Sequence, residues 1–509
     1  MNRMRSLRDV LFDNPKIAPG RNAIMFEERW TSFGELQARV GAVGAALKRT
    51  GIERGDRVAV LLHNRPEFIE SYFAITGLGG IFVPLNWRLH AAEHAALLAD
   101  AEPKLLIAAR AYEAGFARLR QEAPSLRQIV VVNDRSRSDS YEAWIKPGGG
   151  MPGAGELDHD TDAAILYTSG TTSRPKGVVL THGNYLADFA NVASVVQPDQ
   201  NSVNLQISPL YHAACVHSLF HLAHGAATVL IEKFDAGEGL RMIERERASY
   251  FFAAPTALYQ MMDHPEFARR DRSSLKAISY GAAGISKARL EEAARAFGPI
   301  LLHAYGMTET TSHASLLRPA DHALALGSIG KGVGRCDIRV VDKRGETCGP
   351  GEIGEIVIRG PTVMKGYWRR PDATAEAIRG DWLHSGDLAR TDDNGFVYVV
   401  DRKKDMVISG GVNIYPREIE DVISAHPAVA EVAVYGVPDE HWGEALFAAV
   451  VLRTGMTARP PEIVDFCKDR IGGYKVPKRI RIVISLPRNA SGKILKTELR
   501  ALNDQRTPG

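Results

Sequence analysis

Short apolar runs alternate with helical patterns over residues 30–304 of this 509-residue chain, and this alternation limits the fold more than any other feature. Runs rich in Val, Ile and Leu are typical of strands that are buried on both faces. Ser32 and Glu35 have the spacing of a capping box, and apolar residues then recur at helical spacing up to Gly51. This order predicts an α/β fold with mostly parallel sheets. The expected strands are 57–62, 81–85, 105–108, 129–132, 163–167, 227–231, 250–254, 277–280 and 300–304, with helices at 66–75 and 91–100.

The pattern changes twice toward the C-terminus. From residue 339, short strands between Gly-rich turns predict a small β subdomain, and after residue 401 a compact βα pattern runs to the end. A chain of this length exceeds one hydrophobic core, so we expect at least two domains joined at the charged segment 401–405. Segment 146–155 holds five glycines and two prolines and reads as a loop or linker.

Composition excludes several functional classes. Hydrophobic residues make up 45% and charged residues 24%, as in ordinary globular proteins, and a net charge of +3 gives no basis for nucleic-acid binding. The four cysteines are scattered without metal-ligand spacing, which is typical of a reducing compartment. The first 15 residues lack the apolar core of a signal peptide, and the apolar stretch 72–85 is too short to span a bilayer. We expect a cytoplasmic protein.

Residues 167–177 carry the strongest functional signal. Eight of these eleven residues are Thr, Ser, Gly or Lys, which offer a phosphate chain hydroxyls, backbone amides and an ammonium. Apolar runs lead in and out, so the context is strand, loop, strand, unlike a Walker A loop that opens a helix. A flap over a nucleotide triphosphate fits this stretch, and composition alone leaves a polar hairpin turn as the alternative.

Five motifs in order resemble the adenylate-forming acyl-CoA synthetases over nearly the whole chain. They are 167–177, 305–309, 385–387, 401–418 and 487–493. One departure is Ser173, where the family usually has Gly; a Cβ there narrows backbone freedom without removing a hydrogen-bond donor. The resemblance implies a large AMP-binding domain over 1–400, a hinge at 401–404 and a small mobile α+β domain over 405–509.

The resemblance also implies the reaction. An AMP-forming acid–thiol ligase joins a carboxylate to the α-phosphate of ATP, releases pyrophosphate, and then transfers the acyl group from AMP to the thiol of coenzyme A. Such chemistry needs positioning and charge neutralisation rather than a side-chain nucleophile. The expected cofactors are ATP, Mg²⁺ and coenzyme A, and the expected partners are small molecules, with a homodimer allowed.

The family pattern assigns roles to named residues. Lys493 would neutralise charge between carboxylate and α-phosphate, although alone it reads as an exposed lysine in a basic tail. Glu309 would hold Mg²⁺ with Thr168, Tyr305 would stack on adenine, and Asp387 and Arg402 would bind the ribose; in isolation each reads as a surface or core residue. The nucleotide-binding set is Thr168, Ser169, Gly170, Thr171, Thr172, Lys176, Gly281, Ala282, Ala283, Tyr305, Gly306, Met307, Thr308, Asp387 and Arg402.

The acyl pocket is expected beside His212, which resembles the family's aromatic gate; a satisfied core histidine is the rival interpretation. Amino-acid-activating relatives place an Asp near this point, whereas this chain has Ala213, and a neutral pocket would not repay the desolvation of an ammonium. The expected lining is small or apolar: Ala213, Ala214, Gly281, Ala304, Gly306 and Met307. We therefore expect a hydrophobic acid, either a medium- or long-chain fatty acid or an aryl or phenylpropenoic acid.

The second half-reaction is assigned by resemblance alone. The turn Gly410-Gly411 would line the pantetheine channel, and Lys404 matches the family's hinge position. The positions similar to those that contact the coenzyme A nucleotide are Arg88, Trp442, Tyr474 and Lys478. A core residue is the rival interpretation of Trp442.

Two other functions stay open from sequence. One is an adenylating enzyme that loads a carrier protein in trans, because only sixteen residues follow Lys493 and leave no room for an appended carrier domain. The other is a non-catalytic nucleotide-binding protein, which the presence of the expected reactive residues disfavours.

Overall fold

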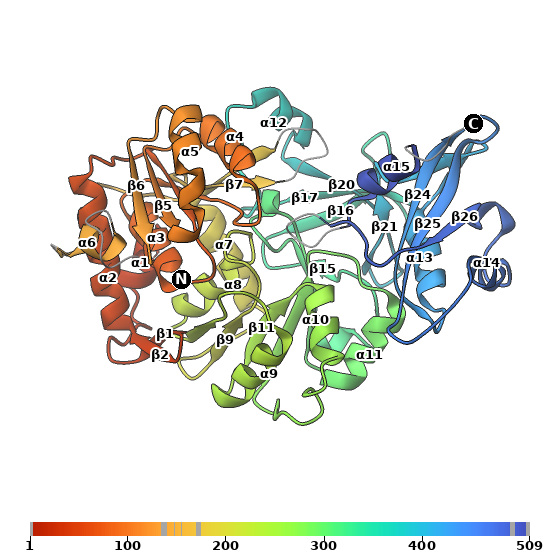
Figure 1. Cartoon of the computed structure of the whole chain (residues 1–509), viewed down its shortest axis with the longest axis horizontal. Helices are drawn as coiled ribbons and strands as arrows, with labels where there is room; N and C mark the ends of the chain where they lie inside the picture. Colours follow the sequence, from red (N-terminus) through yellow and green to blue (C-terminus); the bar gives the residue numbers. More distant parts are fainter. Residues whose placement is uncertain are drawn as a thin grey trace.

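The computed structural model describes residues 4–133, 140–146, 148–153, 155–168, 175–488 and 494–504. It has two large, mostly parallel sheets, a small antiparallel sheet and a separate C-terminal sheet (Figure 1). The predicted α/β fold class is therefore confirmed. Each of the nine strands expected from the sequence forms, with ends within one residue of the prediction.

The first large sheet has seven strands and contains the predicted phosphate-binding hairpin. Its central strands pair in parallel, whereas β7 and β8 form an antiparallel pair on either side of the 167–177 stretch. The strand–loop–strand context predicted from sequence is thus confirmed. In order the strands are β18 (Gly366–Tyr367), β8 (Lys176–Thr181), β7 (Asp162–Thr168), β4 (Ile81–Pro84), β3 (Arg57–Leu61), β5 (Leu105–Ala109) and β6 (Gln128–Val132).

The second large sheet has nine strands. It is parallel from β13 to β1 and antiparallel at both edges. In order the strands are β15 (Lys331–Gly332), β14 (Ser315–Leu317), β13 (Leu301–Tyr305), β12 (Ala277–Gly281), β11 (Tyr250–Ala253), β9 (Val203–Gln206), β10 (Ala227–Leu230), β1 (Asn22–Phe26) and β2 (Arg29–Ser32).

Five strands of this sheet, β1, β2, β9, β14 and β15, were not predicted from sequence. In β9 the cause is polar: Asn204 and Gln206, which alternate with Val203 and Leu205, are buried. Asn204 Nδ2 donates to Ser218 Oγ at 3.2 Å, and Ser218 Oγ donates to Gln206 Oε1 at 2.8 Å. Because these bonds offset part of the cost of burying the two amides, a central strand carries a half-polar sequence that hides it from apolar patterning.

Helices cover both faces of the two sheets. The largest apolar cluster lies between the two sheets and includes an inner set of helices. Two further sets of helices cover the outer faces of the sheets, each with its own apolar cluster. The inner set is α1 (Leu7–Phe12), α2 (Phe33–Arg49), α3 (Pro66–Gly77), α7 (His182–Ala193) and α8 (Cys215–Ala223), with α6 (Tyr141–Ile145) packed beside α2. The outer sets are α4 (Ala91–Ala101) with α5 (Phe116–Glu122), and α9 (Ala236–Arg245) with α10 (Pro255–Met262) and α11 (Lys287–Phe297). The capping box predicted at Ser32 and Glu35 begins α2.

The small sheet confirms the predicted β subdomain and leads to the C-terminal part. It is antiparallel throughout, and its last strand ends at Arg402. Its strands are β16 (Asp337–Val341), β17 (Gly354–Arg359), β20 (Trp382–Thr391), β19 (Ile378–Arg379) and β21 (Val397–Arg402), and α12 (Pro371–Ala377) precedes β19.

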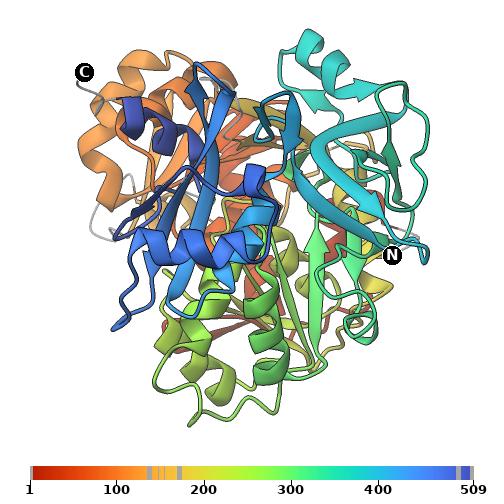
Figure 2. The ribbon, with the colours of Figure 1, turned by 90° about the vertical axis from the view of Figure 1, so that its right-hand side faces the viewer.

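Residues after Arg402 build a sheet with a core of its own. Seen from that side, the C-terminal part lies in front of the large part (Figure 2). Its strands are β22 (Val407–Ser409), β23 (Val412–Ile414), β24 (Val429–Asp439), β25 (Gly443–Leu452) and β26 (Arg479–Ile482), and its helices are α13 (Pro416–Ser424), α14 (Pro460–Lys468) and α15 (Lys496–Asp504). Among the described helices, none has the length and apolar character needed to cross a bilayer.

Candidate active site

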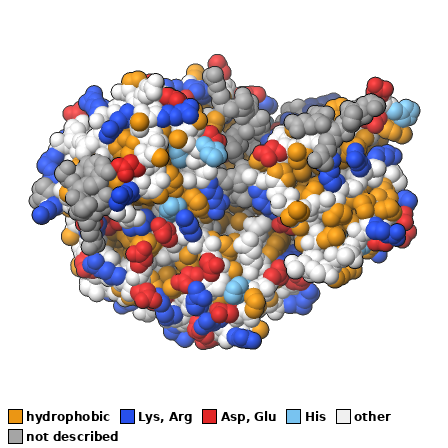
Figure 3. Space-filling model, viewed as in Figure 1, with side chains coloured by type: hydrophobic (Ala, Val, Ile, Leu, Met, Phe, Trp, Pro, Cys, Tyr) orange, Lys and Arg blue, Asp and Glu red, His pale blue; other side chains and the backbone are white. Residues whose placement is uncertain are grey.

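A cavity of about 310 Å³ lies where the large part meets the C-terminal part. The surface is hollowed between the two parts on the face drawn in Figure 3. The walls of the cavity come from the ends of β12, β13 and β21, and from α13, β24 and the start of α15. The predicted residues that line it are Ala282, Ala283, Ala304, Tyr305, Gly306, Asp387 and Arg402.

The ends of β12 and β13 form a tightly packed bed. A Cβ on Gly281 would lie 2.1 Å from the carbonyl oxygen of Ala304, and a Cβ on Gly306 would lie 1.8 Å from that of Ser312. Side chains are therefore excluded at both glycines. Ala282 follows with φ of +66°, a conformation that costs energy in a residue with a Cβ and that is found mostly at functional sites. These features fit the flat approach of a nucleobase, as the sequence predicts.

Asp387 joins Arg402, its partner in the predicted ribose site, to Tyr305, which is predicted to stack on adenine. Its carboxylate is buried, with Oδ2 accepting from the Tyr305 hydroxyl at 2.8 Å and Oδ1 lying 3.1 Å from Arg402 Nε. Burial, and then the adjacent carboxylate, raise the pKa of Tyr305 well above its ordinary value, so the hydroxyl stays a donor. Each carboxylate oxygen keeps a second lone pair, and Asp387 can therefore still accept from sugar hydroxyls.

Glu309 lies in a second polar group, which includes Tyr367 and Lys176, the first residue of β8. Its Oε1 accepts from the Tyr367 hydroxyl at 2.9 Å, and the Lys176 ammonium lies 5.0 Å from the centroid of the Tyr367 ring. Burial and the carboxylate raise the pKa of Tyr367. Tyr367 was missed from sequence because a tyrosine between two Gly-rich turns carries no motif; it reaches the site by pairing with β8. The Thr168 hydroxyl lies 3.5 Å from the Lys176 carbonyl oxygen.

The described residues fit a magnesium ion held mainly by its nucleotide. They contain no group of three or more His, Cys, Asp or Glu side chains arranged as a complete metal site. Mg²⁺ is usually bound through one or two carboxylates together with substrate phosphates, and Glu309 would supply one carboxylate; Glu309 and Lys176 both contact Tyr367. The ion would offset phosphate charge there, while Thr168 as its second ligand stays a prediction.

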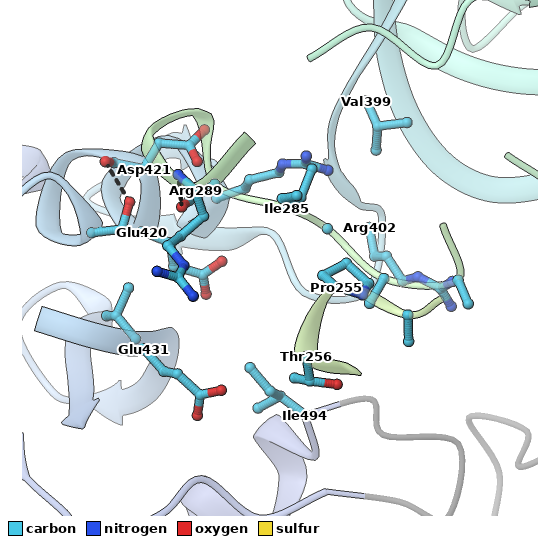
Figure 4. Close-up of a pocket in the computed structure, with 18 of the residues that line it drawn as sticks. Pro255, Thr256, Ile285, Arg289, Val399, Arg402, Glu420, Asp421, Glu431 and Ile494 are labelled. Atoms are coloured by element: carbon cyan, nitrogen blue, oxygen red, sulfur yellow. Dashed lines mark hydrogen bonds between the residues drawn. The ribbon is translucent and has the colours of Figure 1, made fainter. Parts of the chain in front are cut away.

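Several predicted residues fall outside the described part of the chain. These are Ser169, Gly170, Thr171, Thr172 and Lys493. One described residue on each side of this stretch lines the cavity: Arg488 precedes Lys493 and Ile494 follows it. Ile494 lies next to Thr256 (Figure 4). The described residues that border the Lys493 stretch on both sides therefore lie at the wall of the cavity.

A charged network holds the C-terminal wall in position. Asp401 Oδ1 accepts from the Arg402 N–H at 2.7 Å and Oδ2 accepts from the Arg417 N–H, in the first turn of α13, at 3.0 Å. Lys496 Nζ lies 2.8 Å from Glu420 Oε1. Burial opposes the charge of Lys496, but the Glu420 and Asp401 carboxylates outweigh it and raise its pKa. Lys496 was missed from sequence, and only the fold shows its burial.

His212 lies in the loop before α8 and is not a satisfied core histidine. Its Nε2 is buried and has no hydrogen-bond partner among the described residues, while its ring packs 4.2 Å from that of Tyr211. Burial, with a contribution from Arg88, lowers the pKa of His212 to about 4, so the ring is neutral at pH 7. The next residues, Ala213 and Ala214, are half-buried. His212, Ala213 and Ala214 thus carry no charge themselves at pH 7.

The residues predicted for coenzyme A lie away from the cavity. Gly410 and Gly411 form the β22–β23 turn with φ of +57° and +79°, and the Gly410 N–H donates to the Trp442 carbonyl oxygen at 2.8 Å. Lys478 lies 5.5 Å over the Trp442 ring, which is 44% exposed and therefore not a core residue. The others are placed separately: Tyr474 is exposed on the C-terminal part, Arg88 lies over Trp87 in the large part, and Lys404 is exposed two residues after β21.

Comparison with known proteins decides the family. The model of the AMP-binding enzyme family matches residues 11–368, and that of the AMP-binding enzyme C-terminal domain matches 418–493. The chain belongs to the AMP-binding enzyme family. It is 36% identical to an indoleacetate–CoA ligase of Aromatoleum aromaticum, over 96% of this chain and 97% of that one, and 37% identical to a feruloyl-CoA synthase of Amycolatopsis, over 95% and 96%.

Solved structures of AMP-binding enzymes agree with this fold. The o-succinylbenzoate CoA synthetase of Bacillus subtilis, in complex with its acyl-adenylate intermediate, superposes with a TM-score of 0.86 at 32% identity, over 97% of this chain and 98% of that one. The resemblance to adenylate-forming acyl-CoA synthetases is confirmed, and with it the class of AMP-forming acid–thiol ligases and the use of ATP, Mg²⁺ and coenzyme A. The roles of individual residues stay predictions.

We expect Glu309→Gln to lower adenylation by about 10²-fold, because it keeps the shape of the side chain but removes the charge that would pair with Mg²⁺. Pyrophosphate release at varied Mg²⁺ measures the effect, and circular dichroism checks the fold. Tyr367→Phe is the matched control, since it removes the hydrogen bond to Glu309 and keeps the carboxylate. Adenylation should fall less in Tyr367→Phe than in Glu309→Gln. Near wild-type activity of Glu309→Gln at limiting Mg²⁺ would rule out Glu309 as a ligand.

Proposed function

We propose that this chain converts a hydrophobic carboxylic acid to its coenzyme A thioester in two steps at the cavity. In the first, a carboxylate oxygen bonds to the α-phosphorus of ATP and the bond to pyrophosphate breaks. In the second, the thiol sulfur bonds to the acyl carbon, the bond to AMP breaks, and the thiol proton leaves. No enzyme side chain needs to bond covalently to the substrate, so the work of the protein is to hold charges and exclude water.

The observation that carries this proposal is the meeting of two motifs across one cavity. Tyr305 and Arg402 both bind the Asp387 carboxylate on one wall, while Arg488 and Ile494 lie on the other. Lys493 lies in sequence between these two residues, so its ammonium would reach the cavity in which Asp387 is proposed to hold the ribose. Its proposed role there is to offset the repulsion between the carboxylate and the α-phosphate.

The pocket supports an uncharged, hydrophobic acid. His212 is neutral, Ala213 and Ala214 follow it, and Gly306 and Met307 are half-buried on the facing strand end. None of these side chains could pair with an ammonium or a second carboxylate. The similarity to an indoleacetate–CoA ligase and a feruloyl-CoA synthase supports the same class, that is, aryl or phenylpropenoic acids beside medium- and long-chain fatty acids.

The thiol step requires a different placement of the C-terminal domain. The Gly410–Gly411 turn is absent from the cavity wall, and its neighbours Ile408, Val412 and Trp442 are 49%, 46% and 44% exposed. One rigid domain can hardly present both this turn and the Lys493 loop to the cavity at once. We therefore infer that residues 405–509 rotate on a hinge at 401–404 against residues 1–400, between the two half-reactions.

A panel of acids tests the substrate class. Medium-chain fatty, phenylpropenoic and benzoic acids should support pyrophosphate release, whereas amino acids and dicarboxylates should be poorer by about 10²-fold, because their extra charge would be desolvated without a partner. Ala213→Asp is the matched variant: a carboxylate there should depress activity on uncharged acids. Activity confined to amino acids or dicarboxylates would contradict the uncharged pocket.

The hinge is tested by assaying the two half-reactions separately. Lys404→Pro fixes φ near −65° and should still form acyl-adenylate while thioester formation falls by about tenfold or more. The N–H groups that hold this turn belong to Lys403 and Asp405, so proline at 404 removes neither bond. Lys404→Ala keeps backbone freedom and serves as the control.

Lys493→Ala should show the opposite pattern. Adenylation should fall by about 10²-fold, whereas supplied acyl-adenylate should still be converted to thioester. Pyrophosphate release follows the first half-reaction, and thioester formation from synthetic adenylate follows the second. Equal loss of both half-reactions in both variants would overturn the rotation.

Variants of the residues predicted to contact the coenzyme A nucleotide distinguish coenzyme A from a carrier protein as the source of the thiol. A carrier delivers its phosphopantetheine arm without a nucleotide, so Arg88→Ala and Lys478→Ala should raise the KM for coenzyme A and leave the first half-reaction intact. Unchanged KM values for coenzyme A in both variants would favour the carrier. A homodimer also stays a prediction, which the molar mass in solution tests.

A further inference from the structure

The loop between β13 and β14 carries Glu309 and is strained. We call residues 306–313 the Glu309 loop. Thr311, near its end, has φ of +66° and ψ of −58° and is fully buried. A β-branched residue at positive φ is a genuine outlier, and such a conformation persists only where the surrounding structure holds it. The contacts that hold this loop therefore bear on where Glu309 lies.

Asp188, in the middle of α7, binds the end of the Glu309 loop. Its Oδ1 accepts from the His313 N–H at 2.9 Å, and its Oδ2 lies 3.1 Å from His313 Nδ1. Because a carboxylate can only accept, Nδ1 carries the ring proton here. Both side chains are buried, so the carboxylate depends on these two donors for compensation. The pair thus ties the end of the loop to α7 in one orientation.

The same helix also holds the segment that packs on the other side of the loop. The Thr311 hydroxyl donates to the Thr362 carbonyl oxygen at 2.8 Å, and the Glu309 carbonyl oxygen accepts from the Met364 N–H at 2.8 Å. Asn184, in the first turn of α7, donates from Nδ2 to the carbonyl oxygens on either side of Thr362, at 2.8 and 2.9 Å. The Glu309 loop is therefore held against α7 both directly and through this segment.

Helix α7 continues the strand that carries Lys176. Strand β8 begins at Lys176 and ends at Thr181, and α7 follows directly at His182. Thr181 and Asn184 form a reciprocal cap at this junction, with bonds of 2.8 and 3.2 Å. The Glu309 carboxylate and the Lys176 ammonium, which would face the same phosphates, are thus both placed by one strand–helix unit.

We propose that Asp188 is a positioning residue for the first half-reaction: through His313 it sets the place of the Glu309 carboxylate relative to Lys176. The proposal rests on the proposed function and on Glu309 as a ligand of the Mg²⁺ that accompanies ATP. Asp188 is 0% exposed, so it acts through the loop and does not itself bind the nucleotide. Placement matters because a shift of about 1 Å can cost about 10²-fold in rate.

Three variants separate the bonds of Asp188 from its charge and its burial. Asp188→Ala removes the acceptor for both His313 donors. Asp188→Asn removes the charge and keeps both bonds, since its oxygen accepts from the N–H and its amide donates to Nδ1 once the ring proton is on Nε2. Asn191→Ala is the control in the same helix: Asn191 is 1% exposed and bonds outside the loop, to the Arg335 N–H at 3.1 Å and to Cys336 Sγ at 3.2 Å.

ATP binding without turnover is the first readout. Calorimetry on the full chain, without acid, gives the Kd for ATP in Mg²⁺ and in EDTA. Asp188→Ala should lose about tenfold of the affinity that Mg²⁺ adds, as Glu309→Gln should, and should keep its affinity in EDTA. Asp188→Asn and Asn191→Ala should keep the wild-type ratio of the two constants.

Pyrophosphate release then tests whether Asp188 and Glu309 act as a unit. Asp188→Ala should lower the rate by about tenfold in the wild-type background and by less than about threefold in Glu309→Gln, where the carboxylate is already lost. Thioester formation from supplied acyl-adenylate should stay within about twofold of wild type, whereas a general loss of structure would lower both half-reactions. Where Asp188→Ala does not fold, His313→Phe replaces it, because it keeps the backbone bond and loses the ring donor.

Each outcome decides the proposal. A Glu309→Gln chain that binds ATP in Mg²⁺ like wild type would overturn it, because no metal-binding carboxylate would be left to position. Equal effects of Asp188→Ala in both backgrounds, or equal loss of both half-reactions, would make Asp188 a purely structural residue. Asp188→Asn as impaired as Asp188→Ala would assign the effect to charge and overturn positioning through the bonds. Failure of wild type to release pyrophosphate with every acid would instead overturn the proposed function, and ATP binding would still decide the role of Asp188.

Discussion

The bond between Asp387 and its two partners is the interaction on which the rest of this structure depends. Tyr305 ends a strand of the nine-stranded sheet, whereas Asp387 and Arg402 belong to paired strands of the small sheet. A carboxylate that is 4% exposed must be compensated, and the phenol and guanidinium both do so. The phenol and guanidinium that compensate this charge therefore also fix the small sheet against the nine-stranded sheet. This attachment lies next to Arg402, after which the C-terminal part begins.

The position of the cavity follows from this attachment and from the strand order. Parallel strands bring their carboxyl ends to one edge, and β12 and β13 end there in glycine- and alanine-rich turns that leave space above the sheet. The small sheet closes one side of that space and the C-terminal part closes another. A nucleotide site assembled in this way has walls from parts of the chain about 200 residues apart, and none of those parts forms a site alone.

Sequence reasoning predicted the elements well and the contacts between them poorly. Apolar runs identified strands because burial on both faces leaves a continuous apolar signal in the sequence. This signal is missing at β9 because Asn204 and Gln206 are buried there with hydrogen-bond partners. Motif residues such as Asp387 and Arg402 could be named in advance. Tyr367 and Lys496 could not, because each acquires its place from a neighbour far away in the chain: Glu309 and Glu420.

Asp401 shows what this construction means for movement. Both of its carboxylate oxygens are occupied by backbone N–H groups, and one of these belongs to the first turn of α13, whose N-cap residue Tyr415 provides no side-chain cap. The cap of α13 is thus provided by Asp401, which belongs to β21 of the small sheet. In the rotation proposed above, turning the C-terminal part away would replace this bond to a carboxylate by one to water, and a hydrogen bond to a charged group contributes about 1.5–3 kcal/mol net. Asp401 would thus favour the orientation seen here by stabilising the start of α13.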